Sequence, residues 1–107
     1  MWWADLGEPR GVGPGFERPV LVVSSDAFNR SKIATAVCVV VTSNLRLADA
    51  PGNVRLDSGD AGLDRPSVVN VSQVVTLDKA ALVERLGTLD DAHMNLVEHG
   101  LRRVLNL

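Results

Sequence analysis

Two polar residues lie at the ends of predicted strands. Arg18 opens an apolar, β-branched segment over residues 18–24, and Thr42 closes a second one over residues 33–42. If these strands pair antiparallel through the turn between them, the start of the first lies beside the end of the second. Arg18 and Thr42 would then meet at one edge of the sheet. From these residues alone, a solvated strand-end arginine and an ordinary strand-forming threonine remain the preferred interpretations.

Several common catalytic arrangements do not occur in the sequence. The glycines precede a predicted strand and lack the GxGxxG spacing of a phosphate-binding loop, and there is no GxSxG, no HExxH and no cysteine cluster. His93 and His99 lie six apart on a predicted helix, which sends their side chains to different faces. Asp57, Asp60 and Asp64 lack the glycine placement and distal glutamate of a calcium loop, so solvated turn positions are expected. We therefore expect neither a metal nor a cofactor.

The size and composition of the chain limit the remaining choices. Its 107 residues, 46% hydrophobic and 22% charged, predict one domain over residues 1–107 with one core. The longest apolar run, residues 36–41, is too short to cross a membrane, and no leader-like segment opens the chain. Its single cysteine, Cys38, predicts a buried thiol in a reducing cytoplasm. The net charge of −2 argues against nucleic-acid binding unless basic residues gather locally.

Short segments rich in β-branched residues alternate with turn-forming ones. The run at 33–42 is uninterrupted, which predicts burial on both faces. The Gly- and Pro-rich residues 7–15 predict a loop, and residues 25–31 a turn between two strands. The expected strands cover residues 2–6, 18–24, 33–42, 54–56 and 68–76, the last as one bulged strand or two short ones.

The C-terminal third changes to a helical period. Asp78 can cap a short helix that runs to about Leu86 and is closed by Gly87, and Asp90 can cap a second helix with an apolar stripe. Gly100 inside that helix costs about 1 kcal/mol relative to Ala, which close packing against another element or a second subunit would explain. The stripe consists of Met94, Val97, Leu101 and Val104. Together these elements predict a mainly β domain, a partly open barrel with a closing helix.

The ordered motifs of the chain resemble those of the MazF/PemK toxins. They are WWADL at residues 2–6, a Gly-rich loop, RPVLVV at 18–23, VTSN at 41–44, VSQVVTLD at 71–78 and GLRRVLNL at 100–107. The RPV segment alone is a weak signal, whereas the ordered set is specific and covers almost the whole chain. The resemblance implies a small SH3-like, CcdB/PemK-type barrel with short α-helices, usually a homodimer. The Trp pair follows Met1 directly, which predicts a shortened first strand.

The same resemblance implies a sequence-selective endoribonuclease toxin that inhibits translation and growth. Its partner would be an antitoxin whose disordered tail covers the RNA groove. Arg18 matches the family's catalytic arginine and Thr42 its catalytic threonine. Cleavage of single-stranded RNA would use the RNA's own 2′-hydroxyl, without a metal, and leave a 2′,3′-cyclic phosphate and a 5′-hydroxyl. Arginine is a poor base, so the proton-transfer group stays open, with Glu17 and Asp26 as candidates for orienting Arg18.

Further RNA contacts are expected from the loops and one motif strand. Basic side chains could line the groove, Phe16 could stack on a base, and polar residues could read base edges. For each cation, a solvated loop position is an equal alternative. The expected RNA-binding residues are Arg10, Phe16, Arg30, Lys32, Ser43, Asn44, Arg46, Ser72 and Gln73.

Two other functions fit the same fold. A CcdB-like toxin that poisons DNA gyrase acts through C-terminal residues including a tryptophan, whereas this chain ends in Leu105, Asn106 and Leu107. A barrel without catalytic activity could serve as a protein-interaction module. Cleavage of RNA would distinguish the ribonuclease from both.

Overall fold

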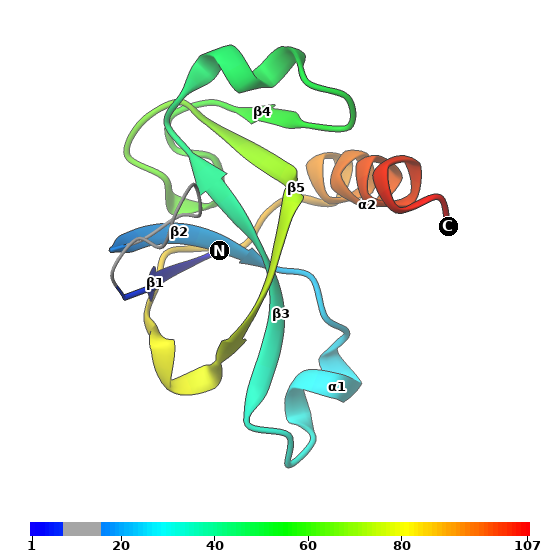
Figure 1. Ribbon diagram of the computed structural model, residues 1–107. Helices are drawn as coiled ribbons and strands as arrows, with labels where there is room; N and C mark the ends of the chain where they lie inside the picture. The colour runs from blue at the N-terminus through cyan, green and yellow to red at the C-terminus, as the bar shows by residue number, and fades with distance from the viewer. Residues whose placement is uncertain (8–15) are drawn as a thin grey trace.

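The computed structural model describes residues 1–7 and 16–107, which form a curled antiparallel sheet with a C-terminal helix (Figure 1). The strand order is β4-β5-β3-β2-β1-β6, and within the described ranges the outer strands β4 and β6 do not pair, so the barrel is partly open. The mainly β fold expected from the sequence is confirmed. The strands are β1 (Trp2–Asp5), β2 (Glu17–Val22), β3 (Thr35–Thr42), β4 (Val54–Leu56), β5 (Ser67–Asp78) and β6 (Leu82–Arg85), and the helices are α1 (Asp26–Arg30) and α2 (Asp91–Leu105).

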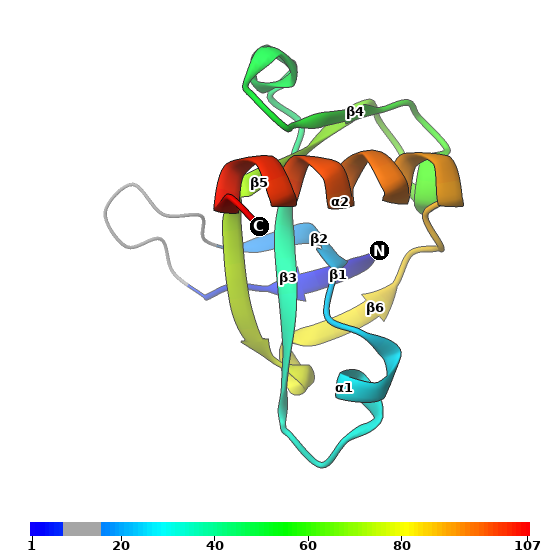
Figure 2. The ribbon, with the colours of Figure 1, turned by 90° about the vertical axis from the view of Figure 1, so that its right-hand side faces the viewer.

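The central strand β3 is buried on both faces, as its uninterrupted apolar run predicts. Val39 and Val41 belong to the larger apolar cluster, together with Val97 of α2, whereas Cys38 belongs to a smaller cluster with Val20 of β2. Figure 2 shows α2 crossing in front of β3. Burial raises the pKa of the Cys38 thiol to about 11, so this side chain packs as a small apolar group and is not a reactive thiolate. None of the described helices has the length and apolar character needed to span a membrane.

The long strand β5 is continuous but carries a pronounced bulge. Residues 70–73 of β5 lie opposite the single residue Val40 of β3. The bulge bends β5, which therefore pairs along its length with β3 and near its start also with β4. Of the two expectations for this segment, one bulged strand is correct. The pairs that flank the bulge are Val39 with Val74 and Val41 with Val69.

The prediction of a helix from Asp78 to Leu86 is wrong, because most of this segment belongs to the sheet. One 3₁₀ turn, Lys79–Ala81, leads into β6, which pairs antiparallel with β1. The Asp78 side chain makes no capping hydrogen bond. The free edge of β1 offers ladder hydrogen bonds to this segment, and these outweigh a weak local preference for helix. The edge of the sheet is therefore β6, and the short β1 with its Trp pair lies inside.

Local capping shapes both helices. The expected turn at residues 25–31 includes the single helical turn α1, whose N-cap Ser25 accepts a hydrogen bond from Phe28 N. Asp90 caps α2 as predicted, since its Oδ1 accepts from His93 N at 2.8 Å. A Cβ placed on Gly100 would lie 2.1 Å from the carbonyl oxygen of Gly52. The close packing predicted for Gly100 is confirmed, and it is made by a turn of the same chain.

Candidate active site

The pairing of β2 with β3 brings Arg18 and Thr42 into one pocket. Val20 pairs with Val40 and Val22 with Cys38, and the same register continued by two residues sets Arg18 opposite Thr42. Both residues line a pocket of about 350 Å³. The full lining is Trp3, Phe16, Glu17, Arg18, Pro19, Val41, Thr42, Ser43, Leu63, Asp64, Arg65 and Ser67.

Arg18 enters this pocket with an unused hydrogen-bond donor. Its Nε is buried and has no acceptor among the described residues. A buried N–H without a partner costs about 1–3 kcal/mol, so Arg18 has donor capacity that the described residues leave unused. A guanidinium can donate two parallel hydrogen bonds to phosphate oxygens. Arg18 therefore makes the pocket suitable for a phosphate group.

The Thr42 hydroxyl is held by the loop that follows β3. Thr42 Oγ1 accepts from Asn44 N at 3.2 Å, and Asn44 Oδ1 accepts from Arg46 N at 3.2 Å, which caps the 3₁₀ helix Leu45–Asp49. Because the hydroxyl accepts here, its own hydrogen is available to a ligand. Ser43 lines the pocket beside it, whereas Asn44 is engaged in the local turn.

Glu17 and Trp3 flank Arg18 in the pocket. Trp3 Nε1 donates to Glu17 Oε2 at 3.0 Å, so a side chain of β1 orients a carboxylate on β2. Asp26, the other acid considered for orienting Arg18, lies on α1 and lines a different pocket. Of the two candidates, the structure places Glu17 in the same pocket as Arg18.

Asp64 and Arg65 line the pocket from the loop before β5, although neither is predicted from the sequence as a residue of this site. They precede β5, and the pairing of Thr42 with Val68 brings their segment beside the end of β3. Arg65 Nε lies 3.5 Å from Asp64 Oδ1, and both side chains are largely exposed. Only the cross-strand register, which is a long-range property, could have indicated their position.

Phe16 holds an unusual backbone conformation at the start of β2. Its φ of +59° lies in the left-handed region, and its side chain is 66% exposed although it lines the pocket. The carbonyl of Phe16 accepts from Leu6 N at 2.8 Å, and its N–H donates to Gly7 O. These hydrogen bonds fix the backbone and leave the aromatic ring free of the core.

The remaining basic residues predicted to bind RNA are dispersed. Arg30 ends α1 and Lys32 lies between α1 and β3, so both stand near the start of β3, roughly 23 Å along the strand from Thr42. Arg46 is exposed on the 3₁₀ helix after β3. Arg10 lies outside the described residues.

Ser72 and Gln73 lie on the β5 bulge, where they bind the side chain of Asn70. Ser72 Oγ donates to Asn70 Oδ1 at 3.1 Å, and Asn70 Nδ2 donates to Gln73 Oε1 at 2.9 Å. Asn53 joins the network, since its Nδ2 donates to Asn70 Oδ1 and its Oδ1 accepts from Val71 N. These bonds satisfy polar groups that the bulge leaves without ladder partners. Neither Ser72 nor Gln73 lines the pocket that holds Arg18.

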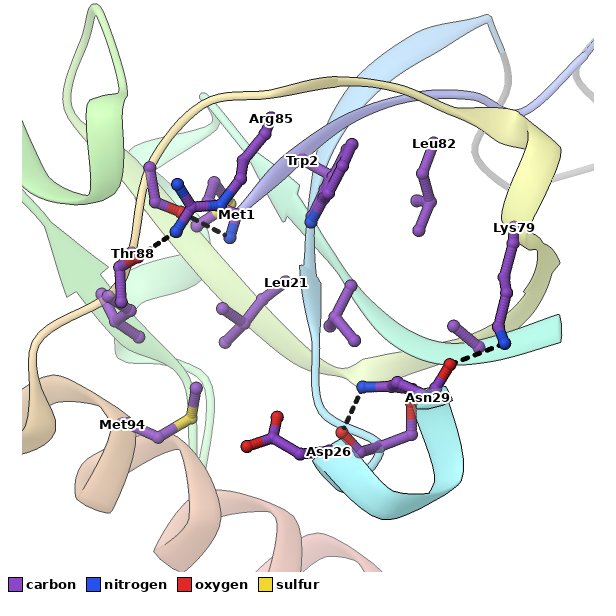
Figure 3. A pocket seen from close by; sticks show the side chains of 15 residues that line it. Met1, Trp2, Leu21, Asp26, Asn29, Lys79, Leu82, Arg85, Thr88 and Met94 are labelled. Carbon is purple, nitrogen blue, oxygen red and sulfur yellow. Dashed lines mark hydrogen bonds between the residues drawn. The ribbon is translucent and has the colours of Figure 1, made fainter. Parts of the chain in front are cut away.

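A second pocket, of about 460 Å³, lies among β1, β2, β6 and α1 (Figure 3). Much of its lining is apolar, with Trp2, Leu21, Leu82 and Met94 from four different elements. Its cationic groups already donate hydrogen bonds within the protein, which leaves them less available to an anionic substrate than Arg18. These bonds join Lys79 to Asn29, Arg85 to Thr88 and the Met1 amino group to Gly87.

Comparison with known proteins identifies the class to which this fold and pocket belong. Residues 1–105 match the PemK-like, MazF-like toxins of type II toxin-antitoxin systems, and the chain belongs to this family. It is 50% identical to endoribonuclease MazF6 of Mycobacterium tuberculosis over 107 residues, which are 100% of this chain and 94% of that protein. It is 35% identical to endoribonuclease EndoA of Bacillus subtilis, covering 100% of this chain and 91% of that protein.

Solved structures show the same fold. An endoribonuclease in complex with its cognate antitoxin, from a mycobacterial species, superimposes with a TM-score of 0.80 at 30% identity, covering 99% of this chain and 90% of that chain. MazF from Deinococcus radiodurans gives a TM-score of 0.81 at 24% identity, covering 99% and 92% of the two chains, and supports the fold alone.

Proposed function

We propose that this chain is an endoribonuclease toxin that cleaves single-stranded RNA in the pocket formed by Arg18 and Thr42. The observation that carries the proposal is the buried Arg18 Nε without an acceptor among the described residues, beside the Thr42 hydroxyl. A site for a phosphodiester needs donors directed at its oxygens, and Arg18 and Thr42 are the donors proposed for this role. The names of the endoribonuclease relatives support the same assignment.

The proposed reaction uses the RNA's own 2′-hydroxyl as nucleophile. Its oxygen loses a proton to a base and forms a bond to the adjacent phosphorus, while the bond from phosphorus to the 5′-oxygen of the next nucleotide breaks and that oxygen takes up a proton from solvent. The products are a 2′,3′-cyclic phosphate and a 5′-hydroxyl, and DNA, which lacks the nucleophile, is not cut. Arg18 donates to the non-bridging oxygens, where negative charge accumulates, and Thr42 orients the phosphate. Neither role requires a metal.

The proton steps are assigned to groups other than arginine, because a guanidinium holds its proton too tightly to serve as a good base. Glu17 is the acid on the same strand as Arg18, and its carboxylate is held by Trp3. In this scheme it accepts a hydrogen bond from the Arg18 guanidinium or a proton from the 2′-hydroxyl. The variant Glu17→Gln keeps the shape of the side chain and distinguishes the two roles by the pH dependence of kcat.

Cleavage in EDTA with mapped product ends tests the proposed chemistry. We expect the purified protein to cut single-stranded RNA at full rate in excess EDTA, because the scheme needs no metal. The fragments should carry 2′,3′-cyclic phosphate and 5′-hydroxyl ends, detected by end-specific ligation and sequencing, which also reveals the recognition sequence. Fragments with 5′-phosphate ends, or activity that returns only with a divalent ion, would contradict the mechanism.

Substrate contacts beyond the scissile phosphate are proposed for Phe16 and Ser43, which line the pocket, and for Arg46, which is exposed on the 3₁₀ helix after β3. The ring of Phe16 is exposed, and base stacking on an aromatic side chain is worth about 1–3 kcal/mol. We expect Phe16→Gly, whose backbone tolerates the positive φ, to raise KM about 5- to 100-fold with little change in kcat. Phe16→Trp retains a stacking surface and should stay near the wild-type KM. If both variants showed a raised KM together with a lowered kcat, Phe16 would have a structural role instead.

The proposed function includes two protein partners and a cytoplasmic location. An antitoxin with a disordered tail that covers the RNA groove is the first, supported by the mycobacterial structure solved with its cognate antitoxin. A second copy of the chain is the other partner. Exposed apolar side chains on the edge strand β6 and at the C-terminal end of α2 support a homodimer, among them Val83, Val104 and Leu105.

A further inference from the structure

A third concave surface lies between β4 and α2 and shares no lining residue with the two pockets described above. It has a volume of about 340 Å³, and we call it the α2 groove. Four of its lining side chains carry or can carry a positive charge: Arg55, His93, His99 and Arg103. The groove lining contains no carboxylate, whereas the Arg18 pocket contains Glu17 and Asp64. In a chain with a net charge of −2, this is a local concentration of positive charge.

The helix period explains why two of these side chains converge, since His99 and Arg103 are separated by one helical turn. His93 lies six residues before His99 and so points to another side of α2, but it too lines the groove, which is wide enough to be lined from both sides. Arg55 approaches from β4, on the opposite wall. Gly52 and Gly100 both line the groove, and their backbones are in contact with each other between the two walls.

The cationic groups of the groove are only weakly engaged within the protein. Arg55 Nε lies 4.0 Å from Asp57 Oδ1 in an exposed ion pair, a type worth about 0.2–1 kcal/mol. No ion pair of Arg103 is found within the described part of the chain. His93 Nδ1 lies 2.7 Å from Asp90 Oδ2, which leaves its other ring nitrogen for a ligand. The hydrogen bond to Asp90 raises the pKa of His93 and so favours the charged imidazolium.

We propose that the α2 groove binds phosphate groups. Guanidinium and imidazolium donors on two walls suit a tetrahedral oxyanion. The sheet register also relates the groove to the Arg18 pocket. Thr42 and Arg55 both pair with Val68, so their Cα atoms lie two strand spacings apart, roughly 10 Å. If the proposed RNA cleavage is correct, a phosphate of the same RNA chain is one source of the ligand, and free phosphate is the other.

A titration with inorganic phosphate tests the groove itself. We expect the backbone amide NMR signals of Gly52, Asn53 and Gly100 to shift with added phosphate in the wild type. Arg103→Gln should weaken this binding about two- to fivefold, the equivalent of one exposed charge contact. Arg102→Gln is the matched control, because it removes the same charge from the adjacent residue of α2 and does not line the groove. Absence of phosphate-dependent shifts at these amides would overturn the proposal, as would equal effects of both variants.

Binding of a 2′-O-methyl oligoribonucleotide, which cannot be cleaved, distinguishes the two sources of phosphate. Its affinity is measured by fluorescence anisotropy at several salt concentrations. If the groove binds the RNA backbone, Arg103→Gln should reduce the slope of log K against log salt by about 0.7, and Arg102→Gln should not. An unchanged slope with retained binding of inorganic phosphate assigns the groove to a free phosphate ligand.

Two further outcomes distinguish phosphate binding in the α2 groove from binding of acidic peptides and from the proposed ribonuclease function. If an oligoglutamate peptide shifts the groove amides and phosphate does not, the groove binds acidic peptides and the phosphate proposal is wrong. Failure of the wild type to cleave RNA, with phosphate binding intact, contradicts the proposed ribonuclease function alone.

Discussion

Arg18→Ala should lower kcat for RNA cleavage by about 10²–10³, the loss typical of removing one donor from a site that stabilises transition-state charge. The Arg18 guanidinium lines the pocket with Thr42, and its buried Nε has no acceptor among the described residues. Its removal leaves the charge that develops on the phosphate oxygens without its strongest donor. The rate is measured in EDTA on a single-stranded RNA that carries the mapped cleavage sequence.

Two control variants make this result specific. Arg18→Lys keeps the positive charge but cannot donate two parallel hydrogen bonds, so we expect an intermediate loss. Arg65→Ala removes an arginine that lines the same pocket but whose side chain is 68% exposed and faces Asp64, so we expect little change in kcat. Equal cleavage by wild type and Arg18→Ala would assign the activity to another residue or to a contaminating nuclease.

Gly100→Ala should destabilise the protein by about 1–3 kcal/mol, as expected for overpacking at a tight contact. In an unobstructed helix the same substitution would stabilise by about 1 kcal/mol, because alanine is the better helix former. Here the new Cβ would lie 2.1 Å from the carbonyl oxygen of Gly52, and backbone must move to accommodate it. The free energy of unfolding is measured by urea titration, with circular dichroism of α2 as the readout.

The matched control lies on the same helix. Asn95 is exposed, and Asn95→Ala should leave stability unchanged or raise it by a few tenths of a kcal/mol. A Gly100→Ala protein more stable than the wild type would show that the turn at Gly52 moves freely, and that the two glycines do not fix the position of α2.

The strands near the candidate active site could be predicted from sequence because their signals are local. The apolar run of β3 indicates burial on both faces, and the short segment between two strands indicates antiparallel pairing. Together they set Arg18 near Thr42 before any coordinates are known. β6 could not be predicted in this way, because Leu82–Arg85 becomes a strand only through its pairing with β1, some 80 residues earlier.

The same distinction separates the parts of the candidate site. Trp3, Asp64 and Arg65 reach the pocket through register between distant strands, and nothing in their local sequence marks them. The prediction that Arg30 and Lys32 bind RNA rests on their charge, which carries no information on distance, and in the structure both lie near the far end of β3. Family resemblance supplied roles for Arg18 and Thr42, whereas hairpin geometry supplied only their proximity.

The position of β1 has a consequence for synthesis of the protein. β1 lies between β2, which follows it closely, and β6, which is made only after most of the chain. During translation one edge of β1 therefore stays unpaired until Leu82–Arg85 has left the ribosome. The core also stays uncovered until α2 has emerged. Because contacts of such high sequence separation form late in folding, we expect the pocket around Arg18 to become rigid only when synthesis is nearly complete.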